Sequence, residues 1–143
     1  QGENDAVVFF WAKNIVPNVD TSPTSVIDIA PTILDLHGVD IPESMTGLPV
    51  GTAPQDRVRY SGASARLGVV QSVTRGSERG VFYWRTGAFE VTDSVTDPGR
   101  HINLFNPSSA QTQDLWELMK PYVYAADPLL AAQPTWPEGL SKE

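Results

Sequence analysis

The chain has 143 residues, a formal net charge of −7 at pH 7 and a hydrophobic content of 41%. This length suits one ordinary domain with a sizeable core, and the apolar content excludes a disordered chain. The acidic balance disfavours nucleic acid and acidic membrane surfaces as partners, and no apolar stretch approaches the ~20 residues that span a bilayer. Cysteine is absent, so disulfides, thiolate metal sites and cysteine nucleophiles are excluded.

The first predicted element is a strand over residues 6–12, where seven apolar residues follow one another. The run is rich in aromatic and β-branched types, and polar residues bound it on both sides. A strand that is apolar on both faces needs cover on both faces, as in a layered α/β sheet. We therefore expect this strand to be fully buried in a larger sheet.

A helix is predicted over residues 28–37. Asp28 stands where its side chain can cap the first free amides, and Pro31 lies in the opening turn, where its missing N–H matters least. Gly38 supplies a left-handed stop at the carboxyl end. One apolar stripe is expected to face the core, and its members are Ile29, Ala30, Ile33, Leu34 and Leu36.

Residues 39–56 are rich in proline and glycine, which predicts an irregular crossing and the best candidate for a domain boundary. An antiparallel meander follows, because the apolar period changes to two. Its predicted strands cover residues 57–61, 67–74, 80–85, 88–95 and 101–105, with turns at 75–80 and 97–100.

The last predicted helix begins near Ser108 and Gln111, which have capping-box spacing. Pro121 predicts a kink or an end around Lys120, and from Ala125 the proline-rich tail predicts an extended arm. The residues expected on the buried face of this helix are Leu115, Leu118, Met119, Tyr122 and Val123.

The predicted fold class is α/β in its α+β form. A buried strand and a helix from a layered α/β sheet precede a small antiparallel sheet that a C-terminal helix covers. We expect three regions: residues 1–50 as the end of an α/β core, 51–124 as the sheet with its closing helix, and 125–143 as the arm.

No catalytic, cofactor-binding or metal-ligating residue can be assigned from motifs, since the chain contains no nucleophile elbow, P-loop, HExxH, GxGxxG or calcium loop. His37 ends the first helix, where a role at the helix terminus outweighs a ligand role by roughly four to one. His101 stands beside Arg100 and could contact an anion, although a solvent-facing position is more common.

Three further sets have two interpretations. Asp28 and Asp35 have the spacing of a metal pair, but Asp28 is already explained as the cap. A solvated hairpin tip is a simpler interpretation than an anion site for Arg75, Glu78 and Arg79. Packing is likewise a better first interpretation than a sugar platform for the aromatic residues Phe82, Tyr83, Trp84 and Phe89.

Residues 22–50, SPTSVIDIAPTILDLHGVDIPESMTGLPV, resemble the C-terminal part of sulfatases and related members of the alkaline phosphatase superfamily. The pattern is a D-x-A-P-T-[IL]-L-x-L-x-G helix followed by P-x-x-x-x-G. Residues 7–13 are similar to a core strand of that family, and 103–109 resemble a weakened E-L-Y-D-L strand and turn. The matching positions are Asp28, Ala30, Pro31, Thr32, Ile33, Leu34, Leu36, Gly38, Pro42 and Gly47.

The resemblance implies that the nucleophile and most metal ligands lie upstream of this region. We therefore carry over no catalytic, cofactor-binding or metal residue, and expect a divalent metal (calcium, zinc or magnesium) in the upstream part. The chain would then be the C-terminal portion of a hydrolase of sulfate or phosphate esters, not catalytic alone, with the upstream portion as its partner. The family also implies a periplasmic or extracellular location.

An alternative is a non-catalytic assembly or binding module. In that interpretation, the apolar strand near the N-terminus would bind a partner or a second copy of the chain by strand addition. Neither interpretation involves nucleic acid or a membrane. The oligomeric state of the isolated chain separates the two hypotheses.

Overall fold

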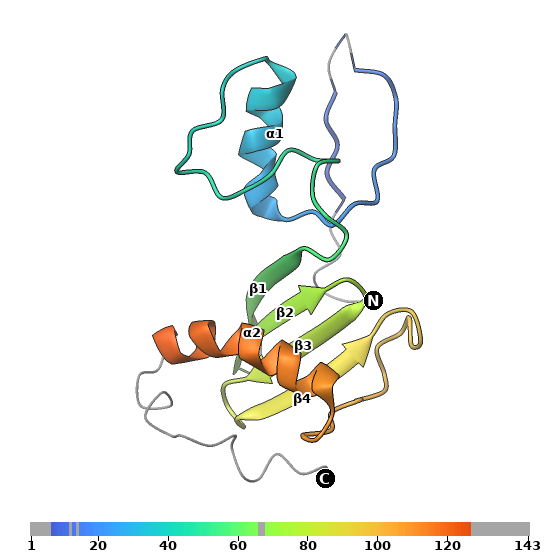
Figure 1. The fold of residues 1–143 in the computed structure, drawn as a ribbon, viewed down its shortest axis with the longest axis vertical. Coiled ribbons are helices and arrows are strands. Elements are labelled where there is room, and N and C mark those ends of the chain that lie inside the picture. Colours follow the sequence, from blue (N-terminus) through green and yellow to red (C-terminus); the bar gives the residue numbers. More distant parts are fainter. Residues whose placement is uncertain (1–6, 12, 14, 66–67, 127–143) are drawn as a thin grey trace. The chain divides into compact units, whose positions relative to one another are not determined.

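The computed structural model describes residues 7–11, 13, 15–65 and 68–126. The chain divides into two compact units, a helix–loop unit (Gly2–Arg59) and a sheet–helix unit (Tyr60–Glu143, with Gln1). Figure 1 shows their elements in chain order. Among the described residues, no helix has the length and hydropathy needed to traverse a bilayer. The assignment of residues 1–50, 51–124 and 125–143 to three functional regions stays a prediction.

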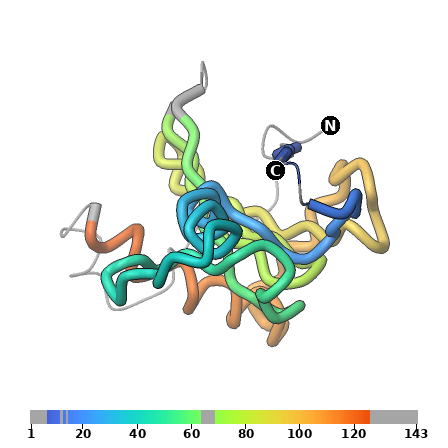
Figure 2. Tube along the Cα trace, turned by 90° about the horizontal axis from the view of Figure 1, so that it is seen from above, coloured from blue at the N-terminus to red at the C-terminus, as the bar shows by residue number. Residues whose placement is uncertain are grey.

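The sheet has four strands, and its spatial order follows the chain. Strand β2 pairs antiparallel with β3, and β3 with β4, so that Val73 lies opposite Gly80 and Phe82 opposite Phe89. Strand β1 is the neighbour of β2 in this order, and Figure 2 shows the two side by side. The predicted meander is thereby confirmed, and its strands are β1 (Val58–Ala65), β2 (Gly68–Arg75), β3 (Glu78–Tyr83) and β4 (Ala88–Asp93).

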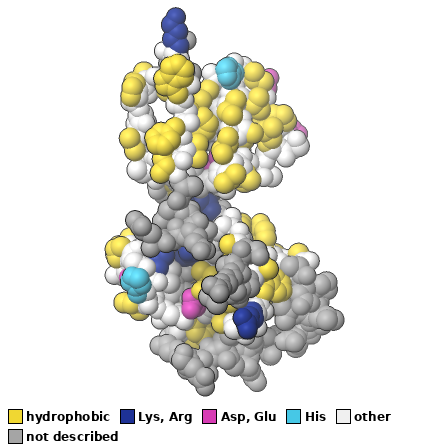
Figure 3. Space-filling view, turned by 180° about the vertical axis from the view of Figure 1, so that it is seen from behind, with side chains coloured by type: hydrophobic (Ala, Val, Ile, Leu, Met, Phe, Trp, Pro, Cys, Tyr) yellow, Lys and Arg dark blue, Asp and Glu magenta, His cyan; other side chains and the backbone are white. Residues whose placement is uncertain are grey.

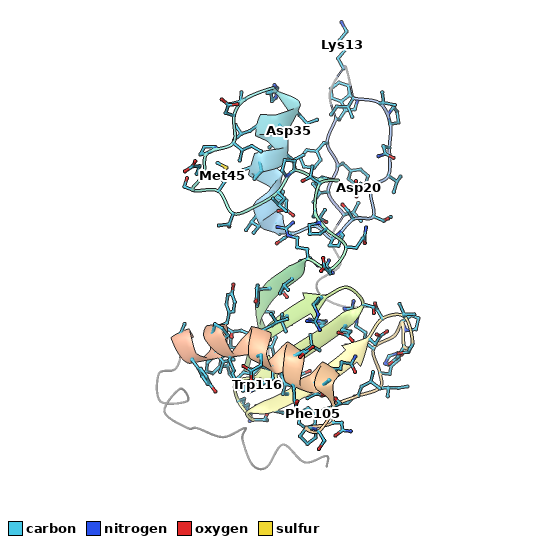
Figure 4. The ribbon with its side chains drawn as sticks, in the orientation of Figure 1. Lys13, Asp20, Asp35, Met45, Phe105 and Trp116 are labelled. Atoms are coloured by element: carbon cyan, nitrogen blue, oxygen red, sulfur yellow. The ribbon has the colours of Figure 1, made fainter. Side chains whose placement is uncertain are left out.

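Helix α2 (Ala110–Ala126) lies across one face of this sheet (Figure 1). Its buried face repeats every four residues, which is the spacing of an amphipathic helix. The ring of Trp116 contacts those of Phe82 and Phe89, with centroids 5.8 and 5.2 Å away, and Phe105 reaches Phe89 from the chain segment before α2 (Figure 4). The buried apolar core consists of Val73, Val81, Phe82, Phe89, Val91, Phe105, Leu115, Trp116, Met119 and Val123.

The fifth strand, predicted over residues 101–105, is not formed. This segment still lies against β4: Leu104 donates its backbone N–H to the Val91 carbonyl at 2.7 Å. The Val91 N–H, however, bonds to the side-chain oxygen of Asn103 at 3.1 Å. Because a side chain takes the place of a backbone carbonyl, regular pairing stops after one residue.

Helix α2 differs from the prediction at both ends. Its N-cap is Ser109, whose hydroxyl accepts the Thr112 N–H at 3.2 Å, so the cap lies one residue beyond the predicted Ser108. The helix also continues through Pro121. Met119 and Val123 are fully buried on either side of the proline, and this packing compensates for the hydrogen bond that proline cannot make. The predicted arm falls mostly on residues 127–143, outside the described residues.

The predicted first helix is confirmed as a short 3₁₀ turn, η1 (Val26–Asp28), that continues into α1 (Ile29–Leu36). Its end is a Schellman motif. Gly38 has φ +65° and donates to the Asp35 carbonyl at 2.9 Å, and Val39 donates to the Leu34 carbonyl at 3.0 Å. The left-handed stop at Gly38 is therefore as predicted.

The apolar stripe of α1 is not buried, contrary to expectation. Ile33 and Leu36 are 45% and 47% exposed, while Pro31 and Thr32 are the buried residues of this helix. Hydrophobic side chains cover much of the visible surface of the helix–loop unit (Figure 3). The described residues provide no apolar partner that buries the stripe.

The buried strand predicted over residues 6–12 is also wrong for this chain. Residues 7–11 are in no strand, and Val7, Phe9 and Trp11 are 76%, 87% and 93% exposed. Residues 6 and 12 lie outside the described residues. A strand that is apolar on both faces needs neighbours in a sheet and layers above and below it, and the described residues supply neither.

Candidate functional site

The most constrained polar group of the helix–loop unit is the carboxylate of Asp28, which is 1% exposed. Arg57 contacts it with both terminal nitrogens, Nη1 to Oδ2 at 2.6 Å and Nη2 to Oδ1 at 2.8 Å. The backbone N–H groups of Leu48 and Ser25 also donate to it, at 2.8 and 2.7 Å. One carboxylate thus joins η1, the irregular loop and the residue before β1.

The pKa of Asp28 lies below its ordinary value of 3.8. Desolvation by burial raises the pKa, but the hydrogen bonds from Arg57, Leu48 and Ser25, together with the Arg57 charge, outweigh that effect. The group is therefore ionised at neutral pH. Since a carboxylate has about four acceptor positions and this one receives four donors, it has no free position for a metal ion or a proton in transfer.

Asp28 is therefore an anchor, and the predicted side-chain cap of α1 is wrong. Asp28 occupies the N-cap position of α1, but its side chain makes no capping hydrogen bond there. It accepts instead from the Ser25 N–H behind it, which is the reciprocal half of a capping box on η1. The Arg57 guanidinium and the Leu48 N–H donate the remaining hydrogen bonds to this carboxylate.

Two other residues of the D-x-A-P-T…G pattern hold the same loop. The hydroxyl of Thr32 donates to the Asp28 carbonyl at 2.6 Å and accepts the Val50 N–H at 3.0 Å. At Gly47 the loop passes so close to η1 that a Cβ would lie 2.1 Å from the Ile27 carbonyl oxygen. The pattern thus corresponds to a close loop–helix contact.

The structure places both histidines and one member of the first acidic pair at exposed positions. His37 occupies the C-cap position of α1, as predicted, and its side chain is exposed. His101 is exposed and belongs to no strand. Asp35 is exposed on α1 (Figure 4), whereas Asp28 is bound to Arg57, so the two do not act as a metal pair.

The hairpin tip and the aromatic set follow their structural interpretations. Arg75 is shared between Glu78 at 3.5 Å and Asp114 at 3.4 Å, and Arg79 donates to Ser72 at 3.3 Å. The aromatic rings separate onto the two faces of the sheet. Phe82, Trp84 and Phe89 belong to the packing beneath α2, whereas the Tyr83 hydroxyl donates to Glu90 at 2.8 Å.

Within residues 7–11, 13, 15–65 and 68–126 no group of three His, Asp or Glu side chains is placed to hold a metal ion. The residue that the sequence prediction missed is Arg57, which was assigned to a strand alone. A signal was present, because an arginine just after a proline-rich crossing and an aspartate at a helix start can form a bidentate pair across a loop. The two residues are 29 positions apart, so no local pattern indicates that they pair.

Neither the models of known protein families nor the curated proteins contain a match to this chain. Solved structures do. BT4656, determined with its substrate D-glucosamine-2-N,6-O-disulfate, shares 19% sequence identity over 70% of this chain with a TM-score of 0.56. A candidate sulfatase from Bacteroides thetaiotaomicron VPI-5482 and the 2-O GAG sulfatase BT1596 each share 17% identity over 73% of the chain, with TM-scores of 0.48 and 0.44.

The chain spans about a quarter of the length of these structures, 24% in each case. At this identity the likeness establishes a shared fold. The resemblance to part of a sulfatase, inferred from residues 22–50, is thereby confirmed at the level of the fold, and so is the α+β arrangement of sheet and helices.

Proposed function

We propose that the chain is the C-terminal portion of a sulfatase-like hydrolase of sulfate esters, with phosphate esters as the related class, and that it is not catalytic alone. The fold shared with BT4656 over 70% of this chain carries the proposal. Because the substrate of that protein is a sulfated amino sugar, sulfated sugars are the first substrates to test.

The exposed apolar surface of the helix–loop unit supports the same proposal. Val7, Phe9 and Trp11 are mostly exposed, as are Ile33 and Leu36. Burying apolar surface of this kind is favourable by about 25 cal/mol per Å², so a partner that covers it would stabilise the unit. An upstream α/β core would cover it, with residues 7–11 entering its sheet.

In this proposal the reactive groups belong to the upstream portion. A divalent metal there would stabilise charge on the transferred group beside the nucleophile. The residues of this chain have a positioning role. The Asp28–Arg57 anchor fixes the loop between α1 and β1, so the surface that meets the core keeps one shape.

The test compares the 143-residue chain with the longer protein that includes the residues before Gln1. Hydrolysis of 4-nitrophenyl sulfate, 4-nitrophenyl phosphate and glucosamine 6-sulfate is measured for both. We expect turnover by the longer protein only, and its loss after treatment with a chelator. Turnover by the 143-residue chain alone, or none by the longer protein, would contradict the proposal.

The assembly module remains the second candidate, since the exposure of Val7, Phe9 and Trp11 suits strand addition as well. Size-exclusion chromatography with light scattering distinguishes it. A stable homo-oligomer of the 143-residue chain that dissociates on Phe9→Asp would favour the module, and a monomer would favour the hydrolase portion. Val95→Asp, at a residue 77% exposed in the sheet–helix unit, is the matched control.

A further inference from the structure

A recess of about 210 Å³ opens in the sheet–helix unit between β1, β2 and α2. It lies beside Gly62 of strand β1, which has no side chain to fill the space. Met119, fully buried, belongs to its lining. The described residues that line it are Tyr60, Ser61, Gly62, Gln71, Ser72, Met119 and Tyr122.

The glycine that opens the recess is not required by the backbone. The φ of Gly62 is outside the left-handed region, unlike those of Gly76 and Gly87. A Cβ at Gly62 would meet only the Val70 carbonyl oxygen, at 3.7 Å, which is ordinary contact. Glycine weakens a strand interior, and where neither conformation nor packing demands it, the close approach of a ligand is one recognised reason for it.

One polar atom of the lining has no partner. The side-chain oxygen of Gln71 is buried and accepts no hydrogen bond from the described residues. A buried acceptor without a donor destabilises the folded protein by about 1–3 kcal/mol. A ligand that offers a hydroxyl or amide hydrogen would supply the missing donor.

An aromatic surface adjoins this acceptor. Tyr60 and Tyr122 stack with ring centroids 3.9 Å apart and planes 29° apart. Their arrangement is fixed, because the Tyr60 hydroxyl donates to the Leu118 carbonyl at 3.3 Å. Tyr122 keeps 45% of its surface exposed, so it can still receive a ligand.

We propose that this recess binds a single neutral sugar ring. The volume lies below the ~300–1,000 Å³ typical of sites for drug-sized ligands, and so admits about one ring. Among the described residues, the lining contains no Asp, Glu, Lys or Arg, so these residues offer no counter-charge for an anionic or cationic ligand. A pyranose presents both a C–H face that packs on tyrosine and hydroxyl donors for Gln71. This binding does not depend on the hydrolase proposal.

The test is an NMR titration of the ¹⁵N-labelled 143-residue chain with methyl β-glucopyranoside, methyl β-galactopyranoside and N-acetylglucosamine. We expect at least one of them to shift the Gln71 side-chain amide and the Gly62 backbone amide with millimolar affinity. Gly62→Val fills the recess and should weaken binding at least tenfold, with the melting temperature unchanged or raised. Gln71→Leu and Tyr122→Ala should weaken it similarly. Tyr124→Ala, outside the lining, is the matched control.

Three results would overturn the proposal. The first is the absence of shifts at Gly62 and Gln71 up to 50 mM of all three sugars, a ceiling on the order of the weakest specific affinities. The second is binding that survives Gly62→Val. The third is tighter binding of glucosamine 6-sulfate or of phenylalanine amide, which would assign the recess to an anionic or a peptide ligand. None of these results bears on ester turnover, so the two proposals fail separately.

Discussion

The helix–loop unit and the sheet–helix unit are stabilised in different ways. Among the described residues, every buried Val, Leu, Phe, Met and Trp side chain belongs to the sheet–helix unit. The helix–loop unit instead buries the Asp28 carboxylate, Thr32 and Pro31, and exposes most of its large hydrophobic side chains. One unit has an interior of its own, while the other has a polar anchor and an uncovered apolar surface.

This difference indicates that the helix–loop unit, and not the sheet–helix unit, depends on a partner that covers its apolar surface. Apolar burial is the dominant favourable term in folding, and a short helix contributes little without it. The sheet–helix unit has that term, and the helix–loop unit, with an eight-residue helix, mostly lacks it. Four predictions test this contrast, in order of decreasing change in stability.

Replacing one tryptophan in each unit should change the free energy of unfolding by very different amounts. Trp116→Ala removes a ring that is 4% exposed and should lower the free energy of unfolding by about 4 kcal/mol. Trp11→Ala removes one that is 93% exposed and should change it by less than about 0.5 kcal/mol. Urea unfolding followed by far-UV circular dichroism measures both. Equal losses would contradict the contrast between the units.

Removing the anchor should unfold the helix–loop unit selectively. Arg57→Ala leaves the buried Asp28 carboxylate without its counter-charge and should destabilise this unit by about 3 kcal/mol. Hydrogen exchange of the Ser25 and Leu48 amides should accelerate, while that of the Val91 amide is unchanged. Arg85→Ala, at an exposed residue, is the matched control. Unchanged exchange at Leu48 would show that the anchor does not hold the loop.

Adding one methyl group at Gly47 in the loop or at Gly62 in β1 should distinguish a tight contact from an ordinary one. Gly47→Ala places a Cβ against the Ile27 carbonyl oxygen and should cost about 2 kcal/mol. Gly62→Ala adds the same atom where only ordinary contact results, so it should be neutral or stabilising. Thermal unfolding of the two variants measures the difference. A tolerated Gly47→Ala would show that the loop can move away from η1.

Acid should loosen the helix–loop unit before the sheet–helix unit. The pKa of Asp28 is lowered in the folded chain, so its contribution to stability is present above the unfolded value of 3.8 and is lost as pH falls through the folded pKa. We expect the protection factor of the Leu48 amide, which corrects for the intrinsic pH dependence of exchange, to fall below pH 3.8 and to change little above it. The effect should be smaller than that of Arg57→Ala, because protonated Asp28 keeps part of its hydrogen bonding.

Asp28→Asn should abolish this acid sensitivity. Asp20, in the same unit, also has a lowered pKa from its hydrogen bonds to Ser22, so Asp20→Asn is the matched control and should leave the acid dependence of Leu48 exchange in place. An acid response that Asp28→Asn does not alter would assign it to another group.

The local elements were largely predictable because local residues determine them. Pro31, with Gly38 seven residues later, bounds α1, and period-two segments around the glycine turn at Gly76 give the meander. Two of the predictions that failed, the strand over residues 101–105 and the side-chain cap at Asp28, failed because side chains form hydrogen bonds with distant groups. Three others concern packing: the stripe through Ile33, the strand over residues 6–12 and the end of α2 at Pro121. Each of these features depends on which residues lie opposite the segment in the fold, and the pattern of the segment itself does not identify those residues.

The approximate positions of α1, α2 and the strands β1 to β4 are readable from the sequence, since caps, turns and periodicity act over a few residues. The same holds for the family pattern that residues 22–50 resemble. The folded chain was needed to reveal three further features: Asp28 binds Arg57, Gly62 opens a recess beside Gln71, and most large apolar side chains of the helix–loop unit are exposed. These features depend on groups far apart in the chain, whose meeting is set by packing and by the charge and hydrogen bonds of the assembled fold.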